Sequence, residues 1–257
     1  MNKALSPSLY YTLIVSLGGF IFGFDASVIS GAIGFIDVEF GLNDWQQGFV
    51  VSSPTLGALI AMLFAGAVSD AIGRRKALIM VASLYLISSI CSALAPSYAL
   101  LVLARFIGGV AFCSLIIAPV YISEISAPEN RGKMVSVNQL NIVFGFALSY
   151  FSNYYFLQLS ASELSWVKEL SIDTQTWRYM LGLEAIPALL WLSLLFTVPR
   201  SPRWLMLKGK VDEAERTVKS LFDEHQAKAQ LGDIQSSLEE RSWPLKERLG
   251  FVVAKSM

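Results

Sequence analysis

Six long stretches of the chain carry almost no charge, and they constrain the fold more than any other feature. They cover residues 9–36, 46–69, 77–95, 97–122, 134–157 and 177–198. A helix needs about 20 apolar residues to cross the hydrocarbon core of a bilayer, and each stretch is close to that length or longer. The chain is 54% hydrophobic and only 16% charged, against roughly 25% charged in soluble domains. The sequence therefore predicts an all-α membrane protein, a bundle of six transmembrane helices in the lipid bilayer.

Basic residues are distributed unevenly between the two sides of this bundle. Arg74, Arg75 and Lys76 lie between the second and third stretches, Arg131 and Lys133 lie between the fourth and fifth, and eleven more follow residue 199. The connections on the other side are nearly free of Lys and Arg. By the positive-inside rule, both termini are expected in the cytoplasm. The net charge of zero gives no indication of a nucleic-acid partner.

The composition changes abruptly after Pro199. We predict that residues 1–198 form the transmembrane bundle and that residues 199–257 form a cytoplasmic helical linker and a truncated tail. Apolar residues recur at helical spacing in this second part, at Val211, Ala214, Val218, Leu221 and Phe222. This pattern predicts an amphipathic helix at the cytoplasmic surface.

One acidic residue, Asp25, interrupts the first apolar stretch, and no other charge occurs between Leu9 and Ile36. A carboxylate at that depth costs at least a few kcal/mol, so it should face a polar cavity or a partner. Arg105 in the fourth stretch is the expected partner. At 1.5 Å per residue, Asp25 lies about 16 Å from the outer end of its stretch and Arg105 about 12 Å from the outer end of its own.

Two interpretations of the Asp25 and Arg105 pair remain open. It is either a static buried ion pair that fixes helix packing or a proton switch. Buried ion pairs are weak indicators of stability. A movement that separates the two groups would leave a buried carboxylate without its compensating charge, and that carboxylate would then take up a proton.

Two connecting motifs resemble a known family. The segments "GAVSDAIGRR" (66–75) and "EISAPENRG" (124–132) are similar to the G-x-x-x-D-x-x-G-R-R and E-x-x-x-x-x-x-R-G motifs of the sugar porter family in the major facilitator superfamily. Further matches are "FGFDASVISG", "RFIGGV", "NQLNIVFG", "WRYMLGLEAIPALL" and "PRSPRWL". The resemblance extends over residues 10–223 and is greatest to bacterial proton-coupled sugar symporters of the xylose type.

The resemblance implies monosaccharide transport by alternating access, with protons as the coupled ion, no cofactor, and a bacterial inner (plasma) membrane as the location. Such transporters rock two bundles of inverted repeats around a site near the membrane midplane. Only the first bundle is expected here, so a C-terminal half of six helices is the expected partner. We therefore expect that this chain alone does not transport, because a homodimer would not supply a complementary sugar-binding wall.

The resemblance also implies site residues. Gln139 matches a sugar-contacting glutamine of the family, and Phe22 is expected to be an apolar wall beside it. On the sequence alone, Gln139 could instead bond a neighbouring helix. A cytoplasmic gating network is expected from Asp70, Gly73, Arg74, Arg75, Glu124, Arg131, Glu184 and Arg203. The alternative is that Arg74 and Arg75 act only as topology anchors.

Two positions depart from the family pattern. Ala71 stands where the family often has arginine, and Arg200 stands where it has glutamate. Both changes remove members of the expected gating network, so they weaken the expectation of a strong gate.

Other function classes find little support. The only histidine, His225, has no Cys or His neighbours that would suggest a metal site. No catalytic residues are predicted, because no nucleophile or paired-carboxylate constellation faces the cytoplasmic side, and an enzyme is not expected. A membrane sugar sensor that does not transport, or an inactive fragment, remains the alternative to a transporter. Asp25 argues against the sensor, since binding alone needs no titratable group.

Overall fold

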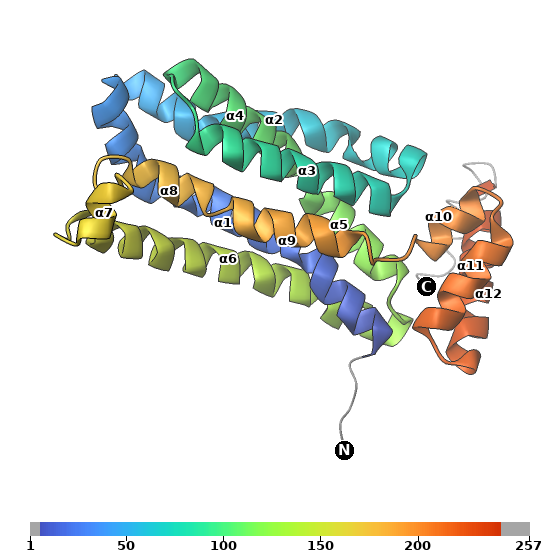
Figure 1. Cartoon of the computed structure of the whole chain (residues 1–257). Coiled ribbons are helices and arrows are strands. Elements are labelled where there is room, and N and C mark those ends of the chain that lie inside the picture. The colour runs from blue at the N-terminus through green and yellow to red at the C-terminus, as the bar shows by residue number, and fades with distance from the viewer. Residues whose placement is uncertain (1–5, 243–257) are drawn as a thin grey trace, which may run out of the picture.

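The computed structural model describes residues 6–242, and all of its regular secondary structure is helical (Figure 1). The elements are α1 (Pro7–Phe40), α2 (Asp44–Ile72), α3 (Arg74–Ala93), α4 (Tyr98–Ala111), α5 (Ser114–Glu124), the short 3-10 helix η1 (Pro128–Asn130), α6 (Arg131–Ser160), α7 (Ser165–Glu169), α8 (Thr176–Gly182), α9 (Ala185–Leu195), α10 (Pro202–Leu207), α11 (Val211–Leu221) and α12 (Glu224–Ser242). Residues 243–257 of the predicted tail lie outside the described residues.

Six helical spans in the described part are long and apolar enough to cross a membrane. They are α1, α2, α3, α4 continued by α5, η1 continued by α6, and α8 continued by α9. The six predicted transmembrane helices and the all-α class are therefore confirmed.

Two of these spans are interrupted near the middle. Between α8 and α9, Pro187 has no N–H to donate to the Leu183 carbonyl four residues earlier, so that carbonyl accepts from the Ile186 N–H at 3.1 Å instead. Between α4 and α5, the chain is over-wound at Phe112, whose N–H bonds the Gly109 carbonyl at 2.9 Å. Both breaks lie close to the polar groups described below.

Glycines let two pairs of helices approach closely. A Cβ on Gly23 of α1 would collide with the Ile142 backbone of α6, and a Cβ on Gly145 of α6 would collide with the Phe20 backbone of α1. Gly57 of α2 and Gly109 of α4 make the same kind of contact. Such small-residue contacts replace the hydrophobic driving force that is absent inside a bilayer.

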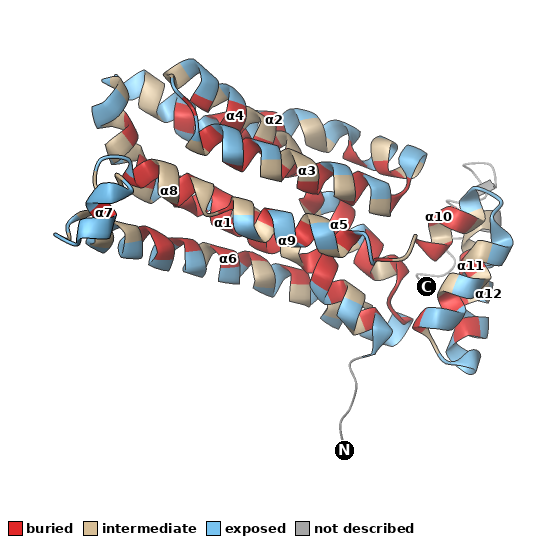
Figure 2. Cartoon of the chain, in the orientation of Figure 1, coloured by how far each residue is buried: buried red, intermediate tan, exposed pale blue. Residues whose placement is uncertain are grey.

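Burial is distributed unevenly over the bundle. In its most apolar window α1 is 78% buried, whereas the α6 span is 22% buried and keeps a long exposed face (Figure 2). The helix α1 is thus the central element, and its polar residues are surrounded by other helices on most sides.

The helices α10, α11 and α12 lie at the end of the bundle where α1 begins (Figure 1). The predicted helix after residue 210 is present as α11, which buries Ala214, Val218 and Leu221. Trp204 and Leu205 of α10 pack against Ala214 of α11. Trp204 also bonds the end of α2 and so connects these helices to the bundle.

Candidate functional site

The structure brings Asp25 of α1 and Arg105 of α4 together inside the bundle. Their Oδ1 and Nη1 atoms are 3.1 Å apart, and their side chains are only 8% and 2% exposed. Gly108, one turn after Arg105, leaves room for the Ser88 hydroxyl, which a Cβ there would approach to 2.5 Å. The predicted pair therefore exists, deep in the membrane-spanning part.

Glu184 is a third member of this cluster, and its assignment to the cytoplasmic gating network is wrong. It is 4% exposed, and its carboxyl lies within hydrogen-bonding reach of the Asp25 carboxyl and electrostatic reach of Arg105. The break that Pro187 causes places Glu184 at the junction of α8 and α9. The position of Glu184 along its apolar stretch could have revealed this location. Glu184 is about 10 Å from the outer end of that stretch, close to the depth of Arg105.

The cluster of Asp25, Arg105 and Glu184 carries two acidic groups and one basic group. With both carboxyls ionised its net charge is minus one, and a single proton neutralises it. Tyr85 of α3 is fully buried, with its hydroxyl 3.5 Å from Ser114 Oγ and within electrostatic reach of both carboxyls. A buried group of this composition can bind and release a proton.

A hollow of about 550 Å³ lies between α1, α5 and α6, and both predicted sugar-binding residues line it. Gln139 is exposed there, and Phe22 forms part of the wall with Pro119 and Phe146. Asn138 also lines the hollow and is 4% exposed, and its Oδ1 has no hydrogen-bond partner within residues 6–242. Amide groups beside aromatic walls are suited to a polar, ring-shaped ligand.

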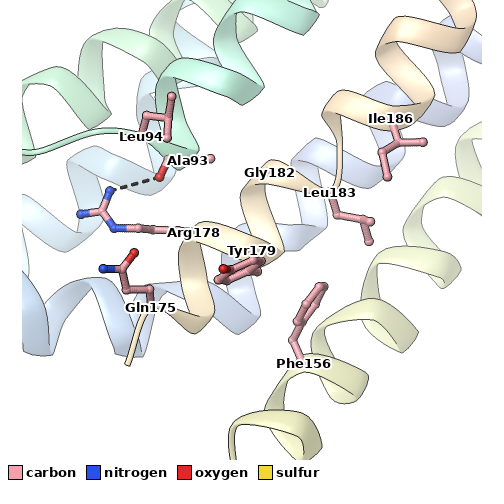
Figure 3. A pocket seen from close by; sticks show the side chains of 9 residues that line it. All are labelled: Ala93, Leu94, Phe156, Gln175, Arg178, Tyr179, Gly182, Leu183 and Ile186. Carbon is pink, nitrogen blue, oxygen red and sulfur yellow. Dashed lines mark hydrogen bonds between the residues drawn. The ribbon is translucent and has the colours of Figure 1, made fainter. Parts of the chain in front are cut away.

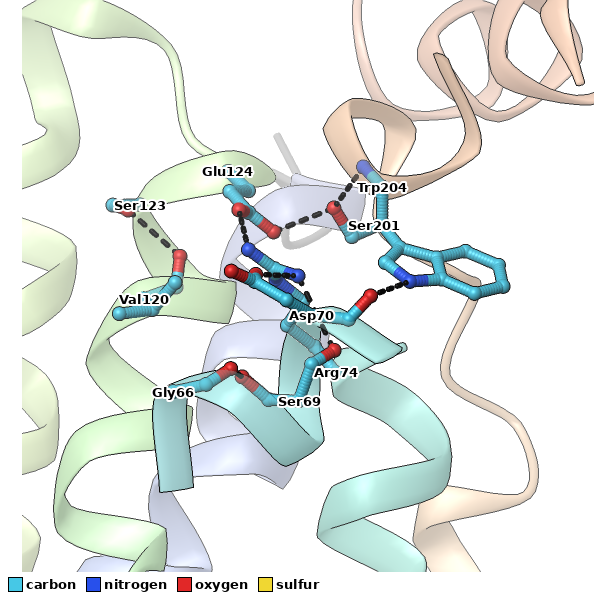
Figure 4. A network of polar contacts seen from close by, with 9 residues as sticks. All are labelled: Gly66, Ser69, Asp70, Arg74, Val120, Ser123, Glu124, Ser201 and Trp204. Carbon is cyan, nitrogen blue, oxygen red and sulfur yellow. Dashed lines mark hydrogen bonds and ion pairs between the residues drawn. The ribbon is translucent and has the colours of Figure 1, made fainter. Parts of the chain in front are cut away.

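At the end where α10 packs, Arg74 is the centre of a polar network (Figure 4). Its guanidinium is 2.6 Å from Asp70 and 3.1 Å from Glu124, and it donates to the Ser69 carbonyl at 3.2 Å. Glu124 also accepts from Ser201 Oγ at 2.5 Å. The three predicted residues Asp70, Arg74 and Glu124 thus connect α2, α3 and α5 to the start of α10.

Gly73 and Trp204 complete the same network (Figure 4). Gly73 has φ +93°, a backbone conformation that favours glycine, and the Trp204 ring covers the place of a Cβ at 3.0 Å. Trp204 Nε1 donates to the Asp70 carbonyl at 3.0 Å. Gly73 therefore allows both the tight turn and the close packing of the Trp204 ring.

Three other predicted members of the network form no ion pair among the described residues. Arg75 donates to the Leu195 and Phe196 carbonyls at 3.3 and 2.5 Å, and Arg131 donates to the Ser126 carbonyl at 3.4 Å. Arg203 lies within electrostatic reach of Glu124. Arg75 is drawn away because the last carbonyls of a helix, here α9, are without intrahelical partners. Within residues 6–242, these three residues therefore form none of the ion pairs predicted for them.

Arg200, which departs from the family pattern, has an acidic partner of its own. Its Nη1 is 3.0 Å from Glu213 of α11, and both side chains are more than one-third exposed. A pair this exposed contributes little stability.

At the opposite end of the bundle, Arg178 of α8 makes several polar contacts that sequence reasoning missed, among them a bond to the Ala93 carbonyl (Figure 3). It is 2.6 Å from Glu39 of α1 and donates to the carbonyls of Ala93 and Ala95 at 3.1 and 2.8 Å. Trp177 Nε1 donates to the same Glu39 carboxylate at 2.5 Å. A hollow of about 460 Å³ beside Arg178 is lined by the end of α3, by Phe156 of α6 and by residues 175–186 of α8 and its flanks. Glu39 and Arg178 are charged residues close to the predicted outer helix ends, and this position was the sequence signal from which their contact could have been predicted.

Comparison with known proteins gives a consistent result. A family model described as "Sugar (and other) transporter" matches residues 11–250. The putative metabolite transport protein YwtG of Bacillus subtilis strain 168 is 38% identical over 248 residues, which are 96% of this chain and 50% of that protein. The D-xylose-proton symporter of Escherichia coli strain K12 is 35% identical over 93% of this chain and 53% of its own length.

A solved structure of the xylose transporter XylE from E. coli, in a partially occluded inward-open conformation, is 34% identical with a TM-score of 0.82. The match covers 91% of this chain and 60% of that one. The chain thus spans about half the length of the curated relatives it matches. With a family match over most of its residues and relatives above 30% identity, the chain belongs to the sugar porter family of the major facilitator superfamily.

Proposed function

We propose that the chain forms the N-terminal bundle of a monosaccharide transporter that couples sugar movement to protons. The observation that carries this proposal is the cluster of Asp25, Arg105 and Glu184, buried in the middle of three membrane spans beside the hollow that Gln139 and Phe22 line. Symport by the E. coli relative supports the assignment of protons and a sugar as substrates.

In this proposal the proton binds to the cluster. With both carboxyls ionised, two negative charges face one guanidinium in a medium of low dielectric constant. Taking up one proton removes the uncompensated charge, which lowers the cost of a conformation in which Asp25 moves away from Arg105. The sugar binds in the adjacent hollow through the Gln139 amide, with the Phe22 ring displacing water from its apolar face.

The Arg74 network is proposed to hold the inner helix ends together while the other side is open. It connects α2, α3 and α5 to α10 through direct contacts. Because the basic residues gather at this end, we propose that it faces the cytoplasm, as do both termini. We also propose that residues 1–198 act as the transmembrane bundle and residues 199–257 as a cytoplasmic linker to a second bundle of six helices.

The test uses a chimera, in which residues 1–257 replace the matching half of the E. coli D-xylose-proton symporter. Wild-type chimera should accumulate labelled xylose in cells without other xylose uptake, and addition of the sugar should make the medium more alkaline. With Asp25→Asn, accumulation and alkalinisation should be lost while exchange of sugar across the membrane persists, because exchange needs no net proton movement.

Asp44→Asn, at the water-exposed start of α2, is the matched control and should behave as wild type. Accumulation by the Asp25→Asn chimera that increases as the external pH falls would show that Asp25 is not the coupling group. Binding of xylose without exchange or accumulation in the wild type would instead identify a sensor.

A further inference from the structure

An uninterrupted series of aromatic rings connects the hollow to the buried cluster. The Phe22 ring, in the wall of the hollow, meets Phe112 edge-on at 4.7 Å between ring centroids and an interplanar angle of 87°. Phe112 in turn lies 6.1 Å from Tyr85, tilted by 37°. The Tyr85 hydroxyl is within electrostatic reach of Asp25 and Glu184. Phe112, only 6% exposed, therefore contacts both the wall of the hollow at Phe22 and Tyr85 beside the cluster, in addition to the path along α1 from Phe22 to Asp25.

Phe112 also lies at a break in its helical span. It occupies the break between α4 and α5, where its N–H bonds the Gly109 carbonyl and its carbonyl accepts from the Leu115 N–H at 3.0 Å, both three residues apart. Short stretches with such 3-10 bonds inside a helix often mark hinges. Arg105 precedes Phe112 by seven residues, about two helical turns, so both side chains lie on the same face of this span.

We propose that Phe112 is a positioning residue that links the protonation of the cluster to the shape of the hollow. A change of charge on Asp25 and Glu184 alters the position of Arg105. Because the buried rings are closely packed, Phe112 has to shift when the groups around it move. Phe112 then displaces Phe22, which forms the sugar-facing wall. The proposal rests on the proposed function, because it takes the cluster as the proton site and the hollow as the sugar site.

The titratable and charged groups around the cluster come from four parts of the fold. They are Asp25 on α1, Tyr85 on α3, Arg105 on α4 and Glu184 between α8 and α9. Cys113, at the α4–α5 break, is a further titratable group and lies within electrostatic reach of Tyr85. Phe112 itself is neutral, so its part in the link is mechanical.

The test follows Phe22 while the cluster titrates, in the full chain held in lipid nanodiscs. Phe22 is labelled as 4-fluorophenylalanine and its fluorine resonance is recorded against pH. The infrared band of the buried carboxyl groups is recorded on the same samples. In the wild type, the resonance should shift with the same pH midpoint as that band. Phe112→Leu should abolish this pH-dependent shift while the carboxyl band still titrates.

Phe146→Leu is the matched control, because Phe146 also contacts Phe22, at 6.3 Å, and has no ring contact with Tyr85. It should leave the titration of Phe22 intact. Should Phe112→Leu fold poorly, Phe112→Met has a similar volume but a flexible, unbranched side chain that adapts to an irregular gap, and it should give the same loss.

Three results would overturn the link. These are a wild-type resonance that stays constant while the carboxyl band titrates, a resonance that still titrates with Phe112→Leu, and an equal loss with Phe146→Leu. If neither Asp25→Asn nor Glu184→Gln changed the carboxyl band, the cluster would not be the proton site. The proposed link would then fail together with the proposed function. The infrared data therefore separate failure of the proposed function from failure of the link.

Discussion

The chain contains two groups of one arginine between two carboxylates, and their surroundings differ. In the middle of the bundle, Arg105 faces Asp25 and Glu184, and all three side chains are almost inaccessible. At the end where α10 packs, Arg74 faces Asp70 and Glu124, but the Asp70 side chain is 44% exposed. The Ser201 hydroxyl donates to Glu124 as well. The same three charges therefore include one well-hydrated carboxylate in one place, whereas all three are buried in the other.

This difference indicates different tasks. In the Arg74 group, water reaches Asp70 and the Ser201 hydroxyl donates to Glu124, so the group can hold helices together through charged hydrogen bonds. In the Arg105 group, where all three side chains are buried, the surplus negative charge is costly, and proton binding is the available compensation. The two groups contain the same kinds of charge, so their surroundings, more than their composition, separate the proposed gating network around Arg74 from the proposed coupling site around Arg105.

The largest expected effect is on stability, from removing the two arginines. Arg105→Leu should lower the free energy of unfolding by about 3–5 kcal/mol, because it leaves two buried carboxyls without a counter-charge. Arg74→Leu should cost less, about 1–3 kcal/mol, since Asp70 can be hydrated. Unfolding of both purified variants in detergent, followed by circular dichroism, measures the difference. Equal losses would mean that burial does not distinguish the two groups.

A smaller effect is expected from Glu124→Gln, which removes the charge between Arg74 and Ser201. Amide hydrogen exchange in α10 and α11 should accelerate roughly tenfold, as expected for a loss of about 1–2 kcal/mol in a charge-assisted contact. Exchange in α8 should stay unchanged. The matched variant Glu184→Gln should give no acceleration in α10. Accelerated exchange in α10 with Glu184→Gln would mean that the two groups are not independent.

The smallest expected effect is that of Ser201→Ala. The Ser201 hydroxyl donates to Glu124 and accepts from the Trp204 N–H at 3.1 Å, where it caps α10. Loss of such a cap costs about 1 kcal/mol, so exchange in α10 should increase about fivefold. Ser220→Ala, in the exposed last turn of α11, is the control. If hydrogen exchange in α10 were unchanged, Ser201 would not stabilise this helix.

Much of this molecule could be predicted from the sequence, because a bilayer permits few solutions. The six apolar stretches could only be helices, and the depths of Asp25 and Arg105 along their stretches placed them opposite one another. The grouping of Glu184 with the cytoplasmic residues followed family motifs instead of depth, whereas the structure places it near Asp25 and Arg105. Applying the same count of residues to Glu184 would have placed it beside Asp25.

Contacts to backbone carbonyls were harder to foresee. Arg75 and Arg178 both bind carbonyls at the ends of other helices, of α9 and α3 respectively. Their partners are set by how the ends of distant helices meet, which no local pattern encodes. Glu39, at the end of α1, was missed for the same reason.

Whether the middle group holds an exchangeable proton is tested most directly by infrared titration of the full chain in nanodiscs. We expect a carbonyl band of a protonated, buried carboxyl that appears as the pH is lowered. It should be lost or strongly altered by Asp25→Asn and by Glu184→Gln, and unchanged by Glu124→Gln. Absence of the band, or an equal change with Glu124→Gln, would contradict the assignment of proton binding to Asp25, Arg105 and Glu184.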